Sequence, residues 1–285
     1  MEVDDGLSIA LELSRRLKKT AEEYDGKYTD GIIRFGATGD TTYEVDVPFE
    51  REVNTYFKSI NTPCRVMTED AGVKDYGQKP KYTFLIDPLD GSRNMRRGLP
   101  LYCSSIAVYD TEATEISQAK CAVIERFDAD EEYVAVAGGG AKLNGERIRP
   151  SNKKSLDDAV LALGAHFASA VPFFASPMLK LGSQVERDER NIMVKCYGAT
   201  ALELALLASG KIDMIFDIRA STPFKATPKT YDIAAGLLMC QEAGAHLQYG
   251  GKRMPQKLPI DPTIGVQVAG AGNQRLFNIL LNTLR

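Results

Sequence analysis

Two aspartates three residues apart form the most informative acidic pair of the sequence. They lie in Asp87-Pro88-Leu89-Asp90-Gly91-Ser92, directly after residues 82–86, whose β-branched and aromatic side chains predict a buried strand. Proline stiffens the turn and so holds the two carboxylates close together. Beside an apolar strand the carboxylates repel each other, and a hard divalent cation bound through oxygen relieves that repulsion. The segment therefore indicates a magnesium site, with a plain acidic turn as the alternative for so short a motif.

The next two residues favour a phosphate site at the same place. Gly91 lets the backbone come close to a ligand, and Ser92 could cap a helix that follows it. Free N–H groups at the start of a helix bind anions. Cations on one side and N–H groups on the other would leave a phosphoryl group polarised and oriented for attack by water.

Four further acids stand at the ends of predicted elements. Glu69 and Asp70 follow a predicted strand, Asp232 opens a predicted helix, and Asp46 ends a predicted extended segment. Taken singly, the first two fit a solvated acidic turn, Asp232 fits an N-cap, and Asp46 fits a strand-end carboxylate. Their own surroundings assign them no function.

Hydrophobic periodicity and turn residues predict the elements that must position these acids. The predicted helices cover residues 7–17, 47–57, 199–209 and 232–242. The predicted strands cover residues 32–35, 43–47, 65–68, 82–86, 101–109, 119–125, 132–137, 159–163, 214–216 and 245–248, and Asn144-Gly145 is a hairpin signal. We expect an α+β domain with an antiparallel sheet over 1–150 and an α/β domain over 151–285, joined by the polar connector 150–154.

Composition excludes several classes of partner. The net charge of −3 comes from 35 basic and 38 acidic residues, so no general field attracts nucleic acid. No apolar run approaches the roughly 20 residues of a membrane span. We therefore expect no nucleic-acid or membrane partner and a cytoplasmic location.

Cysteine and histidine offer no metal-ligand spacing. We interpret the five cysteines as reduced core thiols and both histidines, His166 and His246, as structural or surface residues. The cysteines are Cys64, Cys103, Cys121, Cys196 and Cys240.

Three dispersed motifs together resemble the inositol monophosphatase family in order and approximate spacing. They are Thr68-Glu69-Asp70, the segment 87–92, and Tyr231-Asp232-Ile233-Ala234-Ala235-Gly236. Residues 198–204 look like the inositol-side segment of the family, and the glycine-rich hairpin at 141–145 also matches. The resemblance covers nearly the whole chain and implies the layered αβαβα sandwich of the inositol monophosphatase and fructose bisphosphatase type.

The resemblance also implies a ligand set. Glu69, Asp87 and the carbonyl of Leu89 would hold one Mg2+ ion, and Asp87, Asp90 and Asp232 would hold a second, with Asp87 bridging. Some relatives use a third, weaker metal near Glu69. A cation pair of this kind can bind both the attacking water and the leaving oxygen.

Catalytic and substrate-binding residues carry over in the same way. Asp46 and Ser92 match the water-activating pair, with Ser in place of the more usual Thr, and Glu69 joins them as a catalytic residue. The substrate-binding set implied is Gly91, Ser92, Arg93, Gly198, Ala199, Thr200, Asp217 and Arg219.

Departures from the family pattern bear on the substrate. The family often has Gly-Glu-Glu where this chain has Thr68-Glu69-Asp70, and commonly Trp where Tyr231 stands. Asp40 is a candidate ligand for a third metal, or a solvated loop acid. The stretch between Asp217 and Asp232 is longer than in dedicated inositol enzymes; its cations, which could hold a second phosphate or form a basic solvated loop, are Arg219, Lys225 and Lys229.

The resemblance thus implies a Mg2+-dependent phosphatase of small phosphorylated polyols or sugars, acting on inositol monophosphate and on fructose 1,6-bisphosphate through metal-activated water. A homodimer is expected on the same ground. Two alternatives stay open: a 3'(2'),5'-bisphosphate nucleotidase of the same superfamily, and a catalytically silent metal-binding protein on the same fold. The sequence ranks neither the substrates nor the occupancy of a third metal.

Overall fold

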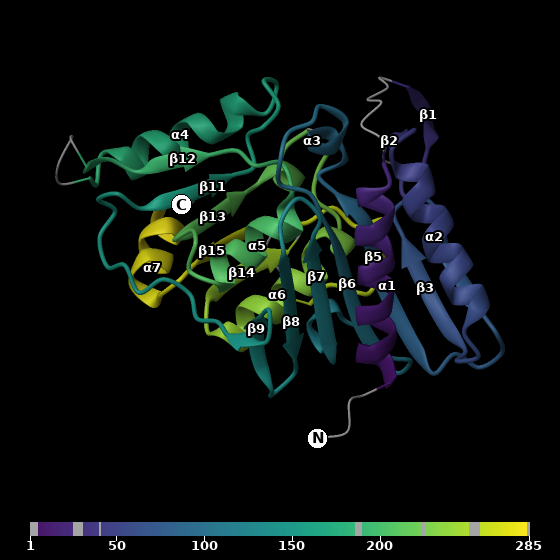
Figure 1. Cartoon of the computed structure of the whole chain (residues 1–285). Coiled ribbons are helices and arrows are strands. Elements are labelled where there is room, and N and C mark those ends of the chain that lie inside the picture. The colour runs from purple at the N-terminus through teal and green to yellow at the C-terminus, as the bar shows by residue number, and fades with distance from the viewer. Residues whose placement is uncertain are drawn as a thin grey trace.

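The computed structural model describes residues 5–24, 31–39, 41–185, 190–223, 226–250 and 257–283. Two sheets with helices between them and on both outer faces make five layers (Figure 1). This arrangement confirms the predicted αβαβα sandwich.

The larger sheet has eight strands in the order β10-β9-β8-β7-β6-β5-β3-β4, and all neighbours are antiparallel except β3 and β5. Its central strand β5 is buried along its whole length, because helices cover both faces of the sheet. The strands are β3 (Cys64–Thr68), β4 (Gly72–Tyr76), β5 (Tyr82–Asp90), β6 (Cys103–Asp110), β7 (Cys121–Arg126), β8 (Glu131–Val136), β9 (Gly140–Leu143) and β10 (Glu146–Arg147).

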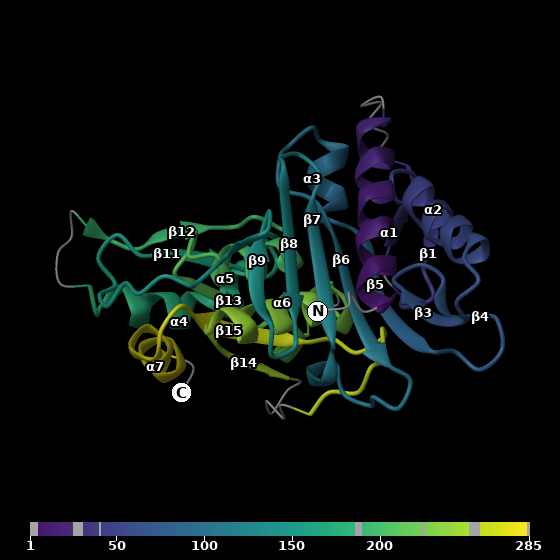
Figure 2. The same ribbon diagram turned by 60° about the horizontal axis from the view of Figure 1, so that its bottom comes forward.

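Helices α1 (Asp5–Glu22) and α2 (Asp46–Ser59) cover the outer face of this sheet (Figures 1 and 2). The buried positions of α1 follow helical spacing, and its apolar face packs against β6 and β7, whose Val108 and Val123 belong to the same core. Both helices were predicted, although α1 is longer at each end than the predicted residues 7–17.

The second sheet has five strands in the order β12-β11-β13-β15-β14. Strand β11 pairs in parallel with β12 and β13, whereas β15 is antiparallel to both of its neighbours. The strands are β11 (Val160–Leu163), β12 (Met193–Lys195), β13 (Met214–Asp217), β14 (His246–Gly250) and β15 (Gln267–Ala271). Helices α4 (Val171–Gly182) and α7 (Gln274–Thr283) cover its outer face.

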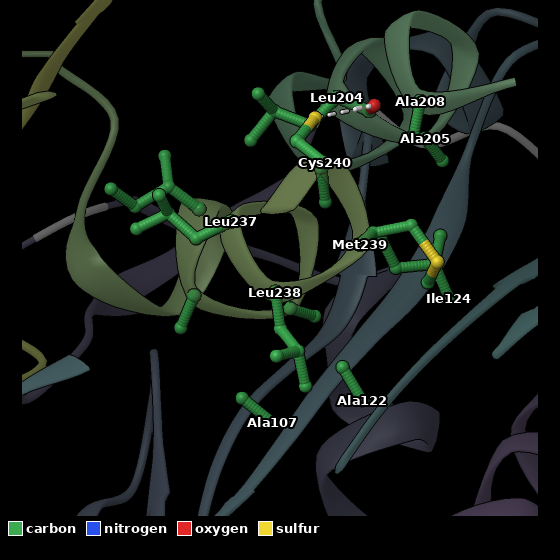
Figure 3. Close-up of a cluster of buried hydrophobic side chains, with 14 of the residues drawn as sticks. Ala107, Ala122, Ile124, Leu204, Ala205, Ala208, Leu237, Leu238, Met239 and Cys240 are labelled. Atoms are coloured by element: carbon green, nitrogen blue, oxygen red, sulfur yellow. Dashed lines mark hydrogen bonds between the residues drawn. The ribbon is translucent and has the colours of Figure 1, made fainter. Parts of the chain in front are cut away.

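Helices α5 (Thr200–Ala208) and α6 (Thr230–Ala243) fill the layer between the two sheets. Figure 3 shows Leu238 and Met239 of α6 pointing at the larger sheet, where Ala107, Ala122 and Ile124 lie. On another side of α6, the Cys240 Sγ donates a hydrogen bond of 3.3 Å to the Leu204 carbonyl of α5 (Figure 3). The two helices are apolar almost all round, as a layer buried on both sides requires.

The predicted strand over residues 43–47 is wrong at its end. Strands β1 (Ile32–Phe35) and β2 (Thr41–Tyr43) form a separate hairpin, but the chain turns at Glu44 and α2 begins at Asp46. The predicted extended segment 43–47 therefore stops at Tyr43. Proline at position 48 suits the first turn of a helix, which is the signal that favours α2 here.

The predicted Asn144-Gly145 turn is confirmed. Both residues have positive φ, 49° and 84°, as a two-residue hairpin between β9 and β10 requires.

Four of the five cysteines are buried, but Cys196 is exposed, so the expectation that all five are core thiols is wrong for that one. No helix in the described ranges is long and apolar enough to cross a bilayer. The division at residue 150 stays a prediction; it falls between the last strand of the larger sheet and β11.

Candidate active site

An irregularity in β5 brings Asp87 and Asp90 together. Residues three apart in a regular strand point to opposite faces. Here the pairing with β6 shifts between Asp87 and Asp90, where Pro88 has no N–H for the ladder and the Leu89 N–H donates instead to Asp87 Oδ1 at 3.0 Å. The strand predicted to end at residue 86 thus continues through the motif, and the bulge turns both carboxylates toward one place.

Asp232 reaches the same place from the first turn of α6. One carboxylate oxygen of each of Asp87, Asp90 and Asp232 lies within 4.8 Å of the others. The Ser105 hydroxyl of β6 donates to the Tyr231 carbonyl at 3.1 Å and so ties the start of α6 to the larger sheet. This acidic cluster joins residues that lie more than 140 positions apart, and it could bind a metal ion.

Burial and mutual repulsion govern the charges of the cluster. Burial raises the pKa of Asp87 well above its usual range, and the charges of Glu69, Asp232 and Asp90 add to the rise. Burial likewise raises the pKa of Asp90, with Asp232 contributing, while the Ala201 N–H at the start of α5 donates to Asp90 Oδ2 at 2.7 Å and opposes the rise. The N-terminus of α5 therefore orients one acid of the cluster from the second sheet's side.

The other predicted ligands and catalytic residues surround the cluster. Glu69, in the turn after β3, and Leu89 line the same cavity as the three acids. Asp46 lies behind that cavity, where its carboxylate accepts a hydrogen bond from the Tyr43 N–H at 2.7 Å and another from the Ser92 hydroxyl. Burial raises the pKa of Asp46 to about 7, and these hydrogen bonds limit the rise. Asp46 and Ser92 thus lie close enough to interact, and their role as the water-activating pair stays a prediction.

Helix α3 (Ser92–Arg96) follows the motif but is only five residues long. Its N-cap is Gly91, with φ of 88°, so the expectation that Ser92 caps a helix is wrong. A side chain at Gly91 would meet the Leu101 carbonyl at 2.8 Å, which is the reason that glycine fits this turn.

A cavity of about 530 Å³ opens above the acidic cluster. Six of the eight predicted substrate-binding residues line it: Gly91, Ser92, Arg93, Gly198, Thr200 and Arg219. Ala199 and Asp217 do not line it, and both are fully buried.

Asp217 is held by Arg219 instead of facing the cavity. The guanidinium contacts both carboxylate oxygens at 2.7–3.1 Å, and the Arg219 N–H donates to Asp217 Oδ1 at 3.0 Å. Burial raises the pKa of Asp217, and the charge and hydrogen bonds of Arg219 oppose that rise. Asp217, expected to bind substrate, is therefore neutralised within the chain by Arg219.

His166 is a cavity residue that the sequence did not reveal. Its Nε2 lies 3.2 Å from Arg219 Nη1, and because arginine only donates, Nε2 accepts and the ring proton is on Nδ1. Burial, Arg219 and Arg93 lower the pKa of His166 to about 3, so the ring is neutral. A lone histidine in apolar sequence gives no signal of this role.

The remaining residues predicted for the site are either outside the described part of the chain or do not line the cavity. Asp40 and Lys225 are outside the described residues. Lys229 does not line the cavity, and its Nζ donates to the Thr263 carbonyl at 3.3 Å. Glu203, which sequence reasoning also missed, is buried on α5 and accepts a hydrogen bond from the Gly198 N–H at 3.2 Å.

The fold and the site define a layered α/β protein with a buried acidic cluster fit for a metal, set in a cavity between two sheets. The chain belongs to the inositol monophosphatase family, whose model matches residues 37–281. The fructose-1,6-bisphosphatase/inositol-1-monophosphatase of Methanothermobacter thermautotrophicus is 29% identical over 290 residues, which cover 97% of this chain and 95% of that protein. The protein of the same name from Thermococcus kodakarensis is 28% identical, with 97% and 96% covered.

Solved structures agree on the fold. The extragenic suppressor protein suhB of Bartonella henselae superimposes with a TM-score of 0.78 at 21% identity and covers 99% of both chains. With the family membership and the relatives named as phosphatases, the chain is a phosphatase of this family.

Proposed function

We propose that the protein is a Mg2+-dependent phosphomonoesterase that hydrolyses inositol monophosphate and fructose 1,6-bisphosphate. The observation that carries the proposal is the convergence of Asp87, Asp90 and Asp232 from both halves of the chain on one point of a ligand-sized cavity. The names of the archaeal relatives supply the two substrates.

The residues at the site fit a hard divalent cation. Mg2+ prefers carboxylate and carbonyl oxygens, and three carboxylates offer oxygens within 4.8 Å of one another. Burial and the crowding of these charges raise the pKa of Asp87 and of Asp90, and a bound cation would offset the repulsion. We assign Glu69, Asp87 and the Leu89 carbonyl to one ion and Asp87, Asp90 and Asp232 to a second.

The protein's own residues would handle the proton of the attacking water. Bound Mg2+ would polarise the phosphoryl group and lower the pKa of a water molecule at the site. The Ser92 hydroxyl donates to Asp46, so its oxygen could accept a proton from the water while its own proton passes to that carboxylate. Because the pKa of Asp46 is raised to about 7, its carboxylate can take up a proton near neutral pH.

The test is Asp90→Asn, an isosteric change that removes one ligand charge. Mg2+-dependent phosphate release from inositol monophosphate should fall roughly a thousandfold, because several kcal/mol of charge stabilisation are lost. Circular dichroism should show an intact fold. Asp130→Asn, at a fully exposed acid, is the matched control.

Two outcomes would contradict the proposal. An Asp90→Asn protein with the wild-type rate would remove the acidic cluster from the reaction. Equal phosphate release by the wild type with Mg2+ and with chelator would indicate a catalytically silent metal-binding protein.

A homodimer, a cytoplasmic location and the division into domains 1–150 and 151–285 stay part of the proposal. Exposed apolar side chains on α4 and β12 support self-association, since contiguous apolar surface marks interfaces. They are Val171, Phe173, Leu179, Met193 and Val194. Sedimentation at increasing protein concentration tests the dimer.

A further inference from the structure

Arg219, the cation expected to hold a second phosphate, has four of its five N–H groups engaged within the chain. Its Nε and Nη2 donate to Asp217, and its Nη1 donates to the Ala226 carbonyl at 2.8 Å and to His166. Only 5% of the residue is exposed. A buried ion pair with nearly all of its donors engaged has little left to offer an incoming anion.

Arg93 is the other permanent cation among the described residues that line the cavity, and its situation is the opposite. The side chain is exposed, and no carboxylate in the described part of the chain lies within ion-pairing distance of it. Its Nε donates to the Tyr43 hydroxyl at 3.2 Å. Within the described residues, no hydrogen bond occupies the edge formed by its two terminal nitrogens, which is the edge that binds phosphate in a bidentate manner.

Two aromatic rings hold this guanidinium in place. Its Cζ lies 4.5 Å from the Phe167 ring centroid and 5.7 Å from that of Tyr43. Phe167 lies between β11 and α4, and Tyr43 ends β2, so the rings come from elements other than those that carry the acidic cluster. Stacking restricts the rotamers of a long side chain in advance and lowers the entropy that binding must offset.

The cavity therefore has an acidic part, made by Asp87, Asp90 and Asp232, and a separate basic position at Arg93. Its volume of about 530 Å³ suits a sugar with two phosphates. A monophosphate bound at the acidic cluster leaves Arg93 without an anion, whereas a bisphosphate engages both positions.

On this basis we infer that Arg93, and not Arg219, binds the second, non-transferred phosphate of a bisphosphate substrate and sets the preference for bisphosphates over monophosphates. The inference rests on the proposed phosphatase function and names the specificity residue of that site. Arg219 is a positioning residue that neutralises Asp217 and orients His166.

The test compares kcat and KM for fructose 1,6-bisphosphate and inositol 1-phosphate in the wild type, Arg93→Gln, Arg93→Lys and Arg97→Gln. Arg97 is an exposed arginine just after α3 that does not line the cavity, so it controls for the loss of one surface charge. For Arg93→Gln we expect KM for the bisphosphate to rise roughly 10- to 100-fold relative to KM for the monophosphate, as loss of a charge-assisted hydrogen bond predicts. Arg93→Lys should recover part of this ratio.

Inhibition by inorganic phosphate separates the two places where Arg93 could act. If the Ki for inorganic phosphate rises in Arg93→Gln as much as KM for the bisphosphate, then Arg93 binds the transferred phosphate and the inference is overturned. An unchanged ratio of the two KM values overturns it as well. Adenosine 3',5'-bisphosphate, assayed beside the sugar, shows whether the preferred bisphosphate is a nucleotide.

The outcomes also distinguish this inference from the proposed function. A wild-type protein that hydrolyses the monophosphate with Mg2+ but shows no preference for any bisphosphate retains the proposed function and loses the inference. A wild-type protein without Mg2+-dependent hydrolysis of either substrate loses the proposed function itself.

Discussion

Asp90 and Asp217 are both buried acids beside the same cavity, yet their charges are handled differently. Asp90 lies among further acids, and backbone N–H groups at the start of α5 donate to it. Asp217 is clamped by Arg219 through both carboxylate oxygens. Acids that are crowded together can bind a cation from solution, whereas an acid paired within the chain has a structural role. The comparison shows that burial of an acid does not by itself mark a ligand.

The largest expected effect falls on the paired acid. Arg219→Met leaves Asp217 buried without its cation, so the free energy of unfolding should fall by about 3 to 5 kcal/mol. Urea unfolding in the presence of chelator measures it. The double variant Asp217→Asn/Arg219→Met should be more stable than Arg219→Met alone, and a double variant that is no more stable would show that the pair is not the cause.

For the acidic cluster, the expected change is a gain in stability when a cation is added. Mg2+ at about 100 times its Kd should raise the free energy of unfolding of the wild type by about 2.7 kcal/mol. Asp90→Asn should lose most of that gain. Thermal unfolding with Mg2+ and with an equal ionic strength of NaCl separates binding from screening, and equal shifts with both salts would argue against a specific site.

Glu203 is a buried acid whose charge interacts with those of Asp90 and Asp217, and it should make the free energy of unfolding depend on pH. Burial raises the pKa of Glu203 to about 7, with the charge of Asp217 adding to the rise. Because the folded-state value lies above the ordinary value of 4.5, the contribution is present below pH 4.5 and is lost as pH rises through about 7.

In chelator, the free energy of unfolding of the wild type should therefore fall between pH 5 and pH 8 by on the order of 2 kcal/mol more than that of Glu203→Gln. Urea unfolding at the two pH values provides the measurement. Parallel pH profiles for the two proteins would place the titrating acid elsewhere.

The smallest effect is expected for one substitution of Ser92, the change to threonine. Ser92→Thr keeps the hydroxyl that bonds to Asp46, so kcat/KM should stay within about threefold of the wild type, whereas Ser92→Ala should lose on the order of a hundredfold. Steady-state kinetics on one substrate gives both numbers. Equal losses in the two variants would mean that the shape of serine matters more than its hydroxyl.

Local patterns predicted most strands because strands such as β5, β6 and β7 are continuous apolar runs bounded by turn residues, whereas the layered fold was implied by the family resemblance. The one misplaced segment, 43–47, shows the limit: Tyr43 and Val47 suit a strand, but Pro48 and the acid at its start belong to a helix. Strand β4 was missed because it is exposed and alternates weakly, and β12 because it is an edge of three residues.

The acidic cluster could be predicted since its members lie in recognisable motifs. The other wall of the cavity could not, because His166 and Phe167 follow a short strand in a stretch with no motif at all. Sequence also gave no means to see that Asp217 turns inward: that depends on the absence of a side chain at Gly164, where a Cβ would come within 2.2 Å of the Asp217 carboxyl carbon. Close packing of this kind is settled by tertiary structure alone.

The Ala201 N–H donates to Asp90 and the Ser105 hydroxyl donates at the start of α6, so both bonds cross the seam between the larger sheet and the helical layer of α5 and α6. A slight separation along that seam would misplace Asp232 and one oxygen of Asp90 long before either sheet melted. Turnover should therefore decline at milder denaturant concentrations than the circular dichroism signal, which makes the rate of catalysis a sensitive gauge of how firmly the two halves are docked.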